Sequence, residues 1–208
     1  MTEHKYHPSE TSFFREETLP YCRGNGLDIG YGGDPIKPTA ITIDFALEGQ
    51  FCGDHPCHIV GDARKLPWFA AHSFDYVYSS HCLEDFAETR QVLREWMRVV
   101  KRGGFLVLLL PDQRKYEQYC RENNLESNPG HQIENFGPEY LGRVLKKVWG
   151  AKIVRIKENL GPYNFLFVIK KRENFREGVR DRLRSVPVLL KIKRAVWPGQ
   201  PPAPTDRD

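Results

Sequence analysis

Short apolar runs separated by polar turns dominate the chain and predict its elements. Five of these runs have the length of buried strands: residues 26–29, 40–45, 58–60, 74–78 and 105–110. The last run is apolar throughout, which is typical of a central strand covered on both faces. Alternation of such strands with helical patterns predicts an α/β fold with a largely parallel sheet.

Helical spacing of apolar positions predicts two helices. The first covers residues 83–100, and the glycine pair at 103–104 is expected to end it. The second covers residues 138–149. Two further strands, at 152–156 and 164–169, are expected to pair antiparallel through a turn and to close the sheet.

The connection between the first two predicted strands is unusually short. Only residues 34–39 separate the glycine turn from the second strand, and two of them are prolines. Such a segment is too short for the crossover helix that usually joins parallel strands. The turn itself contains Gly30, Gly32 and Gly33, which lack a Cβ and let the backbone approach a ligand closely. A nicotinamide oxidoreductase is disfavoured, because the pyrophosphate of its cofactor needs the N-terminus of the missing helix.

The composition adds a division of the chain into segments. With 208 residues, of which 40% are hydrophobic and 28% charged, the chain suits a single globular domain. Residues 170–194 hold ten Lys and Arg against three Asp and Glu, so the net charge of +4 comes from this segment and the body is mildly acidic. We expect a main domain over 1–172, a basic amphipathic helical segment over 173–197 and a disordered tail over 198–208. Residues 175–197 are expected to contact an anionic membrane surface, a protein partner or their own domain.

Targeting signals and metal-binding patterns are weak in this sequence. No apolar run approaches the roughly 20 residues that span a bilayer, and the first residues lack the apolar core of a signal peptide. The five cysteines are scattered, which argues against a disulfide framework and favours a cytoplasmic location. No metal site is expected, because the spacing of Cys52, His55, Cys57 and His58 matches no standard zinc ligand pair.

A series of short motifs accompanies the glycine turn at fixed distances. In chain order they are Asp28-Ile29-Gly30-Tyr31-Gly32, Asp44, Asp62-Ala63, Leu66-Pro67, Phe74-Asp75, Ser80-His81-Cys82-Leu83-Glu84 and the segment 98–104. Over residues 20–170 this series resembles the class I S-adenosylmethionine (SAM)-dependent methyltransferases, especially those with a type 11 methyltransferase domain. The resemblance implies a Rossmann-like seven-stranded sheet in the order 3-2-1-4-5-7-6, here with a shortened first crossover. It also implies SAM (S-adenosyl-L-methionine) as cofactor and S-adenosyl-L-homocysteine as product.

The resemblance places the cofactor at the carboxyl ends of the strands. Asp44 ends the second strand, where a carboxylate can accept hydrogen bonds from both ribose hydroxyls; a turn or capping aspartate is the alternative. In the family, the acid at the position of Asp62 accepts from the adenine amino group. The expected cofactor-binding residues are Asp28, Gly30, Tyr31, Gly32, Asp44, Asp62, Ala63, Ser79 and Ser80. Asp34 stands where the family usually has a third glycine.

Acceptor recognition is expected in the polar stretch 113–136, which is long for a plain connection. Methyl transfer to a hydroxyl requires removal of its proton, and an imidazole titrates near neutral pH. His131, within this stretch, is the first candidate base. His81, at the end of the fourth strand, is the second, although it could instead shape the methionine pocket; Asp112 is the third.

The leading hypothesis is a SAM-dependent methyltransferase that acts on a small-molecule or saccharide acceptor, at oxygen. One alternative is a nucleic-acid methyltransferase that uses the basic C-terminal segment. The acidic body, and the lack of an Asn/Asp-Pro-Pro-Tyr/Phe motif after the fourth strand, count against it. The other alternative is a non-catalytic methyltransferase-fold protein that binds a partner, which the intact Gly30, Gly32, Asp44 and Asp62 disfavour.

Overall fold

The computed structural model describes residues 9–45 and 57–173. The predicted basic helical segment lies outside these residues apart from its first position, and so does the predicted tail. Cys52 and His55 lie outside them as well.

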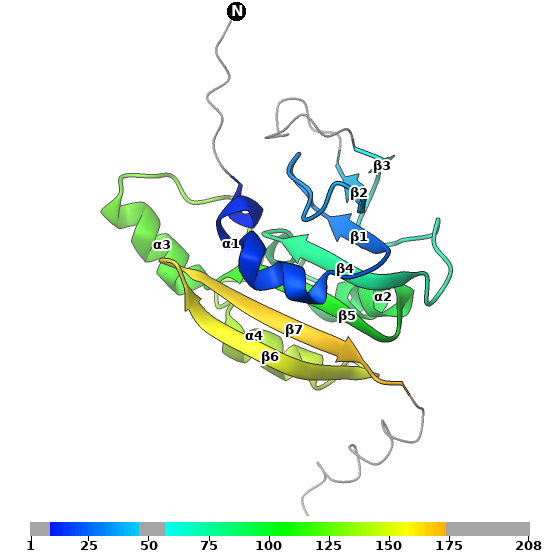
Figure 1. Cartoon of the computed structure of the whole chain (residues 1–208). Helices are drawn as coiled ribbons and strands as arrows, with labels where there is room; N and C mark the ends of the chain where they lie inside the picture. Colours follow the sequence, from blue (N-terminus) through cyan, green and yellow to red (C-terminus); the bar gives the residue numbers. More distant parts are fainter. Residues whose placement is uncertain (1–8, 46–56, 174–208) are drawn as a thin grey trace, which may run out of the picture.

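Seven strands form one mixed sheet in the order β3-β2-β1-β4-β5-β7-β6 (Figure 1). They are β1 (Gly26–Ile29), β2 (Ile41–Asp44), β3 (Ile59–Val60), β4 (Phe74–Ser80), β5 (Val100–Pro111), β6 (Ala151–Leu160) and β7 (Asn164–Lys171). The first five strands pair in parallel, and β7 runs antiparallel to both β5 and β6. The predicted strand order and the antiparallel closing pair are therefore confirmed.

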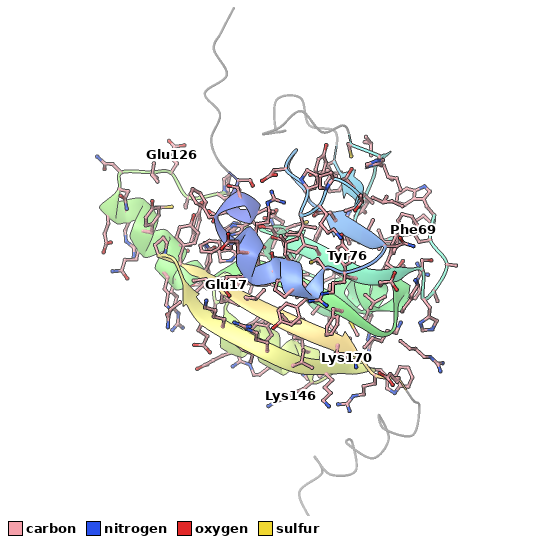
Figure 2. All side chains as sticks on the ribbon, viewed as in Figure 1. Glu17, Phe69, Tyr76, Glu126, Lys146 and Lys170 are labelled. Carbon is pink, nitrogen blue, oxygen red and sulfur yellow. The ribbon has the colours of Figure 1, made fainter. Side chains whose placement is uncertain are left out.

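Helices cover both faces of this sheet. The helical elements are α1 (Glu10–Thr18), η1 (Leu19–Tyr21), η2 (Leu83–Asp85), α2 (Thr89–Val99), α3 (Gln113–Glu122) and α4 (Pro138–Leu145). Apolar residues of α2 and α4 pack on one face, whereas α1 and η1 lie on the other face above Tyr76 (Figures 1 and 2). None of the described helices is long and apolar enough to cross a membrane.

The crossover between β1 and β2 contains turns but no helix, as predicted. Arg15 of α1 holds it in place through hydrogen bonds to the backbone oxygens of Pro35 (2.6 Å) and Ile36 (2.7 Å). The same guanidinium forms an ion pair with Asp34 at 2.5 Å. Asp34, the departure from the family pattern, thus joins the crossover to α1 instead of opening a helix.

The expected helix end at residues 103–104 is wrong. α2 ends at Val99, and β5 begins at the next residue. Phe74 pairs with Val100 and Tyr76 pairs with Phe105, so the residues between them bulge out of the β4–β5 ladder. Both glycines therefore serve a strand bulge and not a helix cap. The predicted helix over 83–100 is also divided, into η2 and α2.

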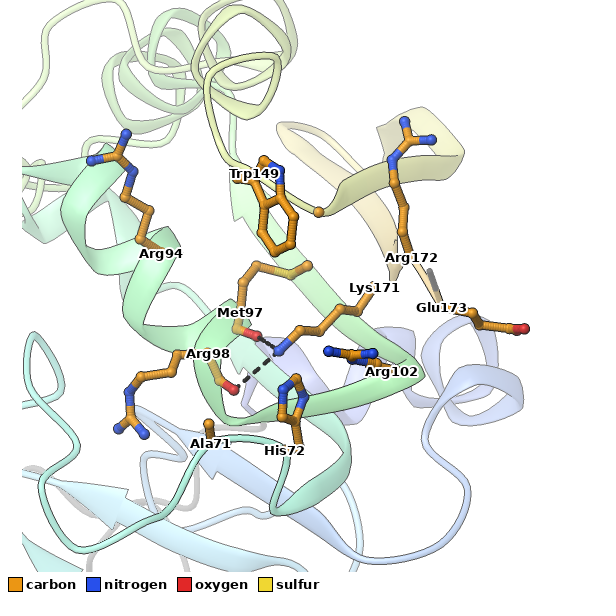
Figure 3. Close-up of a pocket in the computed structure, with 11 residues that line it drawn as sticks. Ala71, His72, Arg94, Met97, Arg98, Arg102, Trp149, Lys171, Arg172 and Glu173 are labelled. Carbon is orange, nitrogen blue, oxygen red and sulfur yellow. Dashed lines mark hydrogen bonds between the residues drawn. The ribbon is translucent and has the colours of Figure 1, made fainter. Parts of the chain in front are cut away.

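Lys171, the last residue of β7, ties this strand to the end of α2. Its side chain is buried, and its ammonium donates to the backbone oxygens of Met97 (2.5 Å) and Arg98 (3.1 Å) (Figure 3). It donates to the backbone oxygen of Val100 (2.7 Å) as well. These carbonyls belong to a helix C-terminus, where no intrahelical donor remains for them. A single buried cation therefore satisfies three backbone groups.

We predict that Lys171→Met lowers the free energy of unfolding by about 2–4 kcal/mol, because buried carbonyls lose charge-assisted hydrogen bonds. Urea denaturation at pH 7 measures the loss. Lys170→Met is the matched control, since among the described residues the Lys170 side chain pairs with the exposed Glu173. Its effect is expected to stay within about 0.5 kcal/mol. Equal effects of the two substitutions would contradict this role of Lys171.

Candidate functional site

The glycine turn after β1 is packed on one side and open on the other. Gly30 has a φ of +68°, and a Cβ there would lie 2.6 Å from the Cβ of Cys82. Gly32 has a φ of +60°, but a Cβ there would meet no atom within 4 Å. Gly30 thus lies where there is no room for a side chain, whereas Gly32 lies where the backbone faces open space. A ligand can approach the backbone at Gly32.

Asp44 lies directly beside this turn. Its Oδ2 accepts a hydrogen bond from the Gly32 N–H (3.0 Å), and its Oδ1 accepts one from the Phe45 N–H (2.8 Å). Burial raises the pKa of Asp44, while the two N–H groups favour its charged form. The structure thus brings together the turn and the acid that sequence reasoning singled out separately.

Asp28 lies beneath the turn and is fully buried. Its Oδ2 accepts from the Ile36 N–H (2.6 Å), which fastens the far side of the crossover to β1. Burial raises the pKa of Asp28 to about 8. Its Oδ1 has no hydrogen-bond partner among the described residues. Asp28 therefore supports the turn from below.

Three other predicted cofactor residues lie at the same strand ends. Tyr31, within the turn, is buried, and burial raises its pKa to about 12. Ser79 is also buried and donates from Oγ to the Ile29 carbonyl (2.9 Å), which joins β4 to β1 at the level of the turn. Ser80 follows it as the last residue of β4.

Asp62 and Ala63 follow β3 at the same edge of the sheet. The Asp62 carboxylate is partly exposed and engaged by Arg64, whose Nε lies 3.0 and 2.9 Å from its two oxygens. This ion pair lowers the pKa of Asp62. The Ala63 carbonyl accepts from the indole N–H of Trp96 (2.8 Å). The side chain of Arg64 thus already occupies both oxygens of Asp62.

His81 stands at the C-terminal end of β4, with a φ of +47°. Its Nε2 lies 2.7 Å from Oδ1 of Asn164. The Asn164 amide donates in turn to Oε2 of Glu10 (3.0 Å), so its oxygen faces the imidazole. Nε2 of His81 is therefore the donor, and Nδ1 carries the lone pair. Burial lowers the pKa of His81.

His131 is oriented in the same way from the opposite side. Its Nδ1 lies 2.6 Å from Oε1 of Gln113, whose amide nitrogen donates to Oε1 of Glu117 (2.9 Å). Nδ1 is thus the donor, and Nε2 carries the lone pair. Burial lowers the pKa of His131. The structure places the two candidate bases in one cluster, where burial favours the neutral form of both.

Glu84 occupies the space between the two histidines. Its Oε1 lies 3.8 Å from Nδ1 of His81 and 3.8 Å from Nε2 of His131. The side chain is 1% exposed, and neither oxygen has a hydrogen-bond partner among the described residues. Sequence reasoning used Glu84 only as part of a family motif and did not predict a site role for it. The signal in the sequence that could have indicated a site role was its position four residues after Ser80, the last residue of β4.

The polar stretch 113–136 differs from the expected loop. Its first part forms α3, and the third candidate base, Asp112, is the N-cap of this helix. The side chain of Asp112 accepts from the Lys115 N–H at 3.4 Å. The remaining residues fold back so that Gln132 N–H donates to the Glu84 carbonyl (3.0 Å) and His131 reaches the site. Only this second part forms the expected irregular segment.

Two cavities clarify where ligands can enter. One of about 360 Å³ lies between α1 and the β6–β7 turn, lined by Glu10, Phe14, Tyr119 and Tyr163. It borders Asn164, the partner of His81. Another of about 400 Å³ surrounds Lys171 where α2 ends, and thus lies by the N-terminal part of β5 (Figure 3). The glycine turn and His81 lie at the carboxyl ends of their strands, away from this second cavity. The first cavity is therefore assigned to the site, because it borders Asn164, the partner of His81.

No cluster of three or more His, Cys, Asp or Glu side chains able to hold a metal ion occurs within residues 9–45 and 57–173.

Comparison with known proteins finds a domain family that matches part of the chain. A family model described as a methyltransferase domain matches residues 39–108, which span β2 to β5. Demethylmenaquinone methyltransferase of Thermotoga maritima is 46% identical over 90 residues, which make up 43% of this chain. The match covers only 34% of that relative.

Solved structures share the fold. A SAM-dependent methyltransferase from Archaeoglobus fulgidus has a TM-score of 0.63 at 20% identity, over 81% of this chain and 97% of that chain. Another from Thermotoga maritima, described as a possible histamine N-methyltransferase, has a TM-score of 0.59 at 17% identity, over 76% and 88%. Together with the family model, these structures confirm the resemblance and the fold class.

We predict that Gly30→Ala destabilises the protein far more than Gly32→Ala. The first substitution adds a clash with Cys82 to the strain of a positive φ and should cost about 3 kcal/mol or more. The second adds only the strain, about 1 kcal/mol. Urea denaturation of the two variants measures the difference. Equal losses would show that the turn is not packed against Cys82.

We also predict that Asp28 makes stability fall as pH rises. Its pKa of about 8 in the folded protein lies above that of an unfolded aspartate, about 4. Between these values the folded state keeps a proton that the unfolded state has lost, so stability decreases from pH 5 to pH 8. Asp28→Asn should reduce this decrease by roughly 2 kcal/mol.

Urea midpoints at the two pH values measure this effect, with Glu139→Gln on the exposed surface of α4 as control. Parallel pH dependence in Asp28→Asn and wild type would rule out a protonated Asp28.

Proposed function

We propose that the chain is a class I SAM-dependent methyltransferase and that it transfers a methyl group from SAM to an oxygen atom of a small-molecule or saccharide acceptor. The observation that carries this proposal is the contact between Asp44 and the Gly32 N–H at the carboxyl ends of β1 and β2. Ligands of open α/β sheets bind at this edge.

The donor side of the site suits the nucleoside part of SAM. Among the described residues, the two carboxylate oxygens of Asp44 accept from backbone N–H groups, and ribose hydroxyls can take the same positions. Asp62 and the backbone at Ala63 lie at the next strand end, where adenine would bind. The open face of Gly32 leaves room for the ligand chain between them.

The acceptor side suits a group that must lose a proton. When bound, SAM supplies an electrophilic methyl group, so the protein chiefly positions donor and acceptor. His131 remains the first candidate base and His81 the second, because each points a lone pair into the same buried space. Proton removal by such a group contributes to the rate of transfer to a hydroxyl.

The names of two similar proteins support a small acceptor. One is a demethylmenaquinone methyltransferase, and the other is described as a possible histamine N-methyltransferase. Both names refer to small molecules. The cavity of about 360 Å³ beside Asn164 has a size that suits such an acceptor or one sugar unit.

We predict that calorimetry detects micromolar binding of SAM and S-adenosyl-L-homocysteine to the wild-type protein. Asp44→Ala should weaken both at least about 30-fold, because it removes the charged acceptor to which the ribose hydroxyls would donate. Glu139→Ala, on the exposed surface of α4, is the control and should bind as wild type does.

A folded wild-type protein that binds neither compound would overturn the enzyme assignment. Unchanged affinity in Asp44→Ala would overturn the ribose contact alone.

A further inference from the structure

We propose that Glu84, His81 and His131 form one proton-sharing centre, in which Glu84 balances the charge that the imidazoles acquire from the methyl acceptor. The role of this centre in catalysis rests on the proposed methyl transfer, whereas the arrangement of the three side chains does not depend on it. Glu84 acts through the two histidines and is therefore a positioning residue.

The first argument is the direction of the two lone pairs. Asn164 fixes the proton of His81 on Nε2, and Gln113 fixes the proton of His131 on Nδ1. The remaining nitrogens, Nδ1 of His81 and Nε2 of His131, are each 3.8 Å from the same oxygen, Oε1 of Glu84. Independent elements, β7 and α3, thus orient two acceptors toward one carboxyl group.

The second argument is burial. Glu84 is 1% exposed and His131 is 5% exposed, so an unpaired charge on either would be costly. Neither oxygen of Glu84 has a hydrogen-bond partner among the described residues. The lone pairs of the two histidines and the carboxyl oxygens of Glu84 are therefore acceptors that face one another. A neutral carboxylic acid, which supplies one O–H, meets this need at rest.

The charged groups around the centre favour the same resting state. Asp85 follows Glu84 in η2, and Glu10 reaches in from α1. Both raise the pKa of Glu84 further, in addition to burial, which is the main cause. Glu117 of α3 faces His131. The backbone N–H groups of Glu84 and Cys82 oppose this rise in pKa, and no Lys or Arg side chain is among its causes. The imidazoles of His81 and His131, each 3.8 Å from the carboxyl group, can balance its negative charge.

The proton transfer balances as follows. The bond between the acceptor oxygen and its hydrogen breaks, and an N–H bond forms at Nε2 of His131. The O–H bond of Glu84 breaks, and its proton forms an N–H bond at Nδ1 of His81. Two imidazolium groups then face one carboxylate, so the centre has gained one positive charge, equal to the charge that the sulfonium loses. His81, with 21% of its side chain exposed, releases the extra proton to solvent.

The distances suit this exchange. An N–H···O bond between charged groups is about 2.8 Å long, so each nitrogen is about 1 Å too far from the carboxyl at rest. A small movement of the Glu84 side chain, or a bridging water, closes either gap. The resting centre is therefore close to the geometry of an ion pair, and it contracts when both imidazoles are charged.

The test uses the full-length protein without cofactor or acceptor, labelled with ¹⁵N in histidine. Imidazole ¹⁵N–¹H spectra between pH 5 and pH 9 report the tautomer and the titration midpoint of each ring. His81→Gln and His131→Gln assign the two signals. Wild type should show the Nε2–H tautomer for His81 and the Nδ1–H tautomer for His131 at pH 8.

The decisive variant is Glu84→Gln, which retains the neutral form of the side chain but cannot ionise. It should lower the midpoints of His81 and His131 by at least one pH unit, a tenfold loss of proton affinity. Glu88→Gln, an exposed carboxylate on the same segment, should leave both midpoints unchanged. Unchanged midpoints in Glu84→Gln, or reversed tautomers in wild type, would overturn the proposal.

Two further measurements distinguish a failure of this proposal from a folding defect and from a failure of the methyltransferase assignment. If Glu84→Gln fails to fold, judged by its backbone amide spectrum, His131→Gln takes its place. It should raise the His81 midpoint because His81 then has the carboxyl group to itself, and an unmoved midpoint would overturn the sharing. SAM calorimetry decides the methyltransferase assignment independently, since the titration requires no cofactor.

Discussion

The structure depends on how a helix-free crossover between β1 and β2 satisfies its backbone groups. Without a helix, the glycine turn and the residues after it must find partners in side chains. Asp44 takes the N–H of Gly32 from one side, and Asp28 takes the N–H of Ile36 from below. Arg15 of α1 holds the crossover carbonyls from above. The short connection thus fixes a carboxylate at the end of β2, directly beside the backbone of the glycine turn.

The other half of the site differs, because it contains buried acceptors without a hydrogen-bond partner among the described residues, namely the two carboxyl oxygens of Glu84. Buried polar groups are usually hydrogen-bonded, and each exception calls for an explanation. Glu84 is such an exception, and it lies between two imidazoles whose tautomers are fixed by amides from other elements. Leaving these acceptors unpaired costs stability in the resting protein. A methyl acceptor with a hydroxyl group would supply a proton to these acceptors and so relieve this cost. The unpaired acceptors are thus consistent with the proposed proton removal.

Much of the fold was predictable because it depends on local signals. Apolar runs fixed the strands, and the two prolines of the crossover excluded a helix. Asp44 was predictable because strand ends in a parallel sheet share one edge. Glu84 was not, since its role arises from residues far away in the chain, Asn164 and Gln113, which orient its neighbours. The helix α3 was missed because its residues are polar, although Asp112 offered an N-cap signal. Gly103 and its neighbour look like a helix end in sequence, yet only strand pairing reveals the bulge.

The central claim is that donor and acceptor meet at the carboxyl ends of β1, β2 and β4. A crystal structure with S-adenosyl-L-homocysteine tests it most directly. The account predicts that the ribose hydroxyls bind Asp44, that the adenine lies near Asp62, and that the sulfur faces the space between His81, Glu84 and His131. A nucleoside bound at another edge of the sheet, or a sulfur directed away from the histidines, would contradict it.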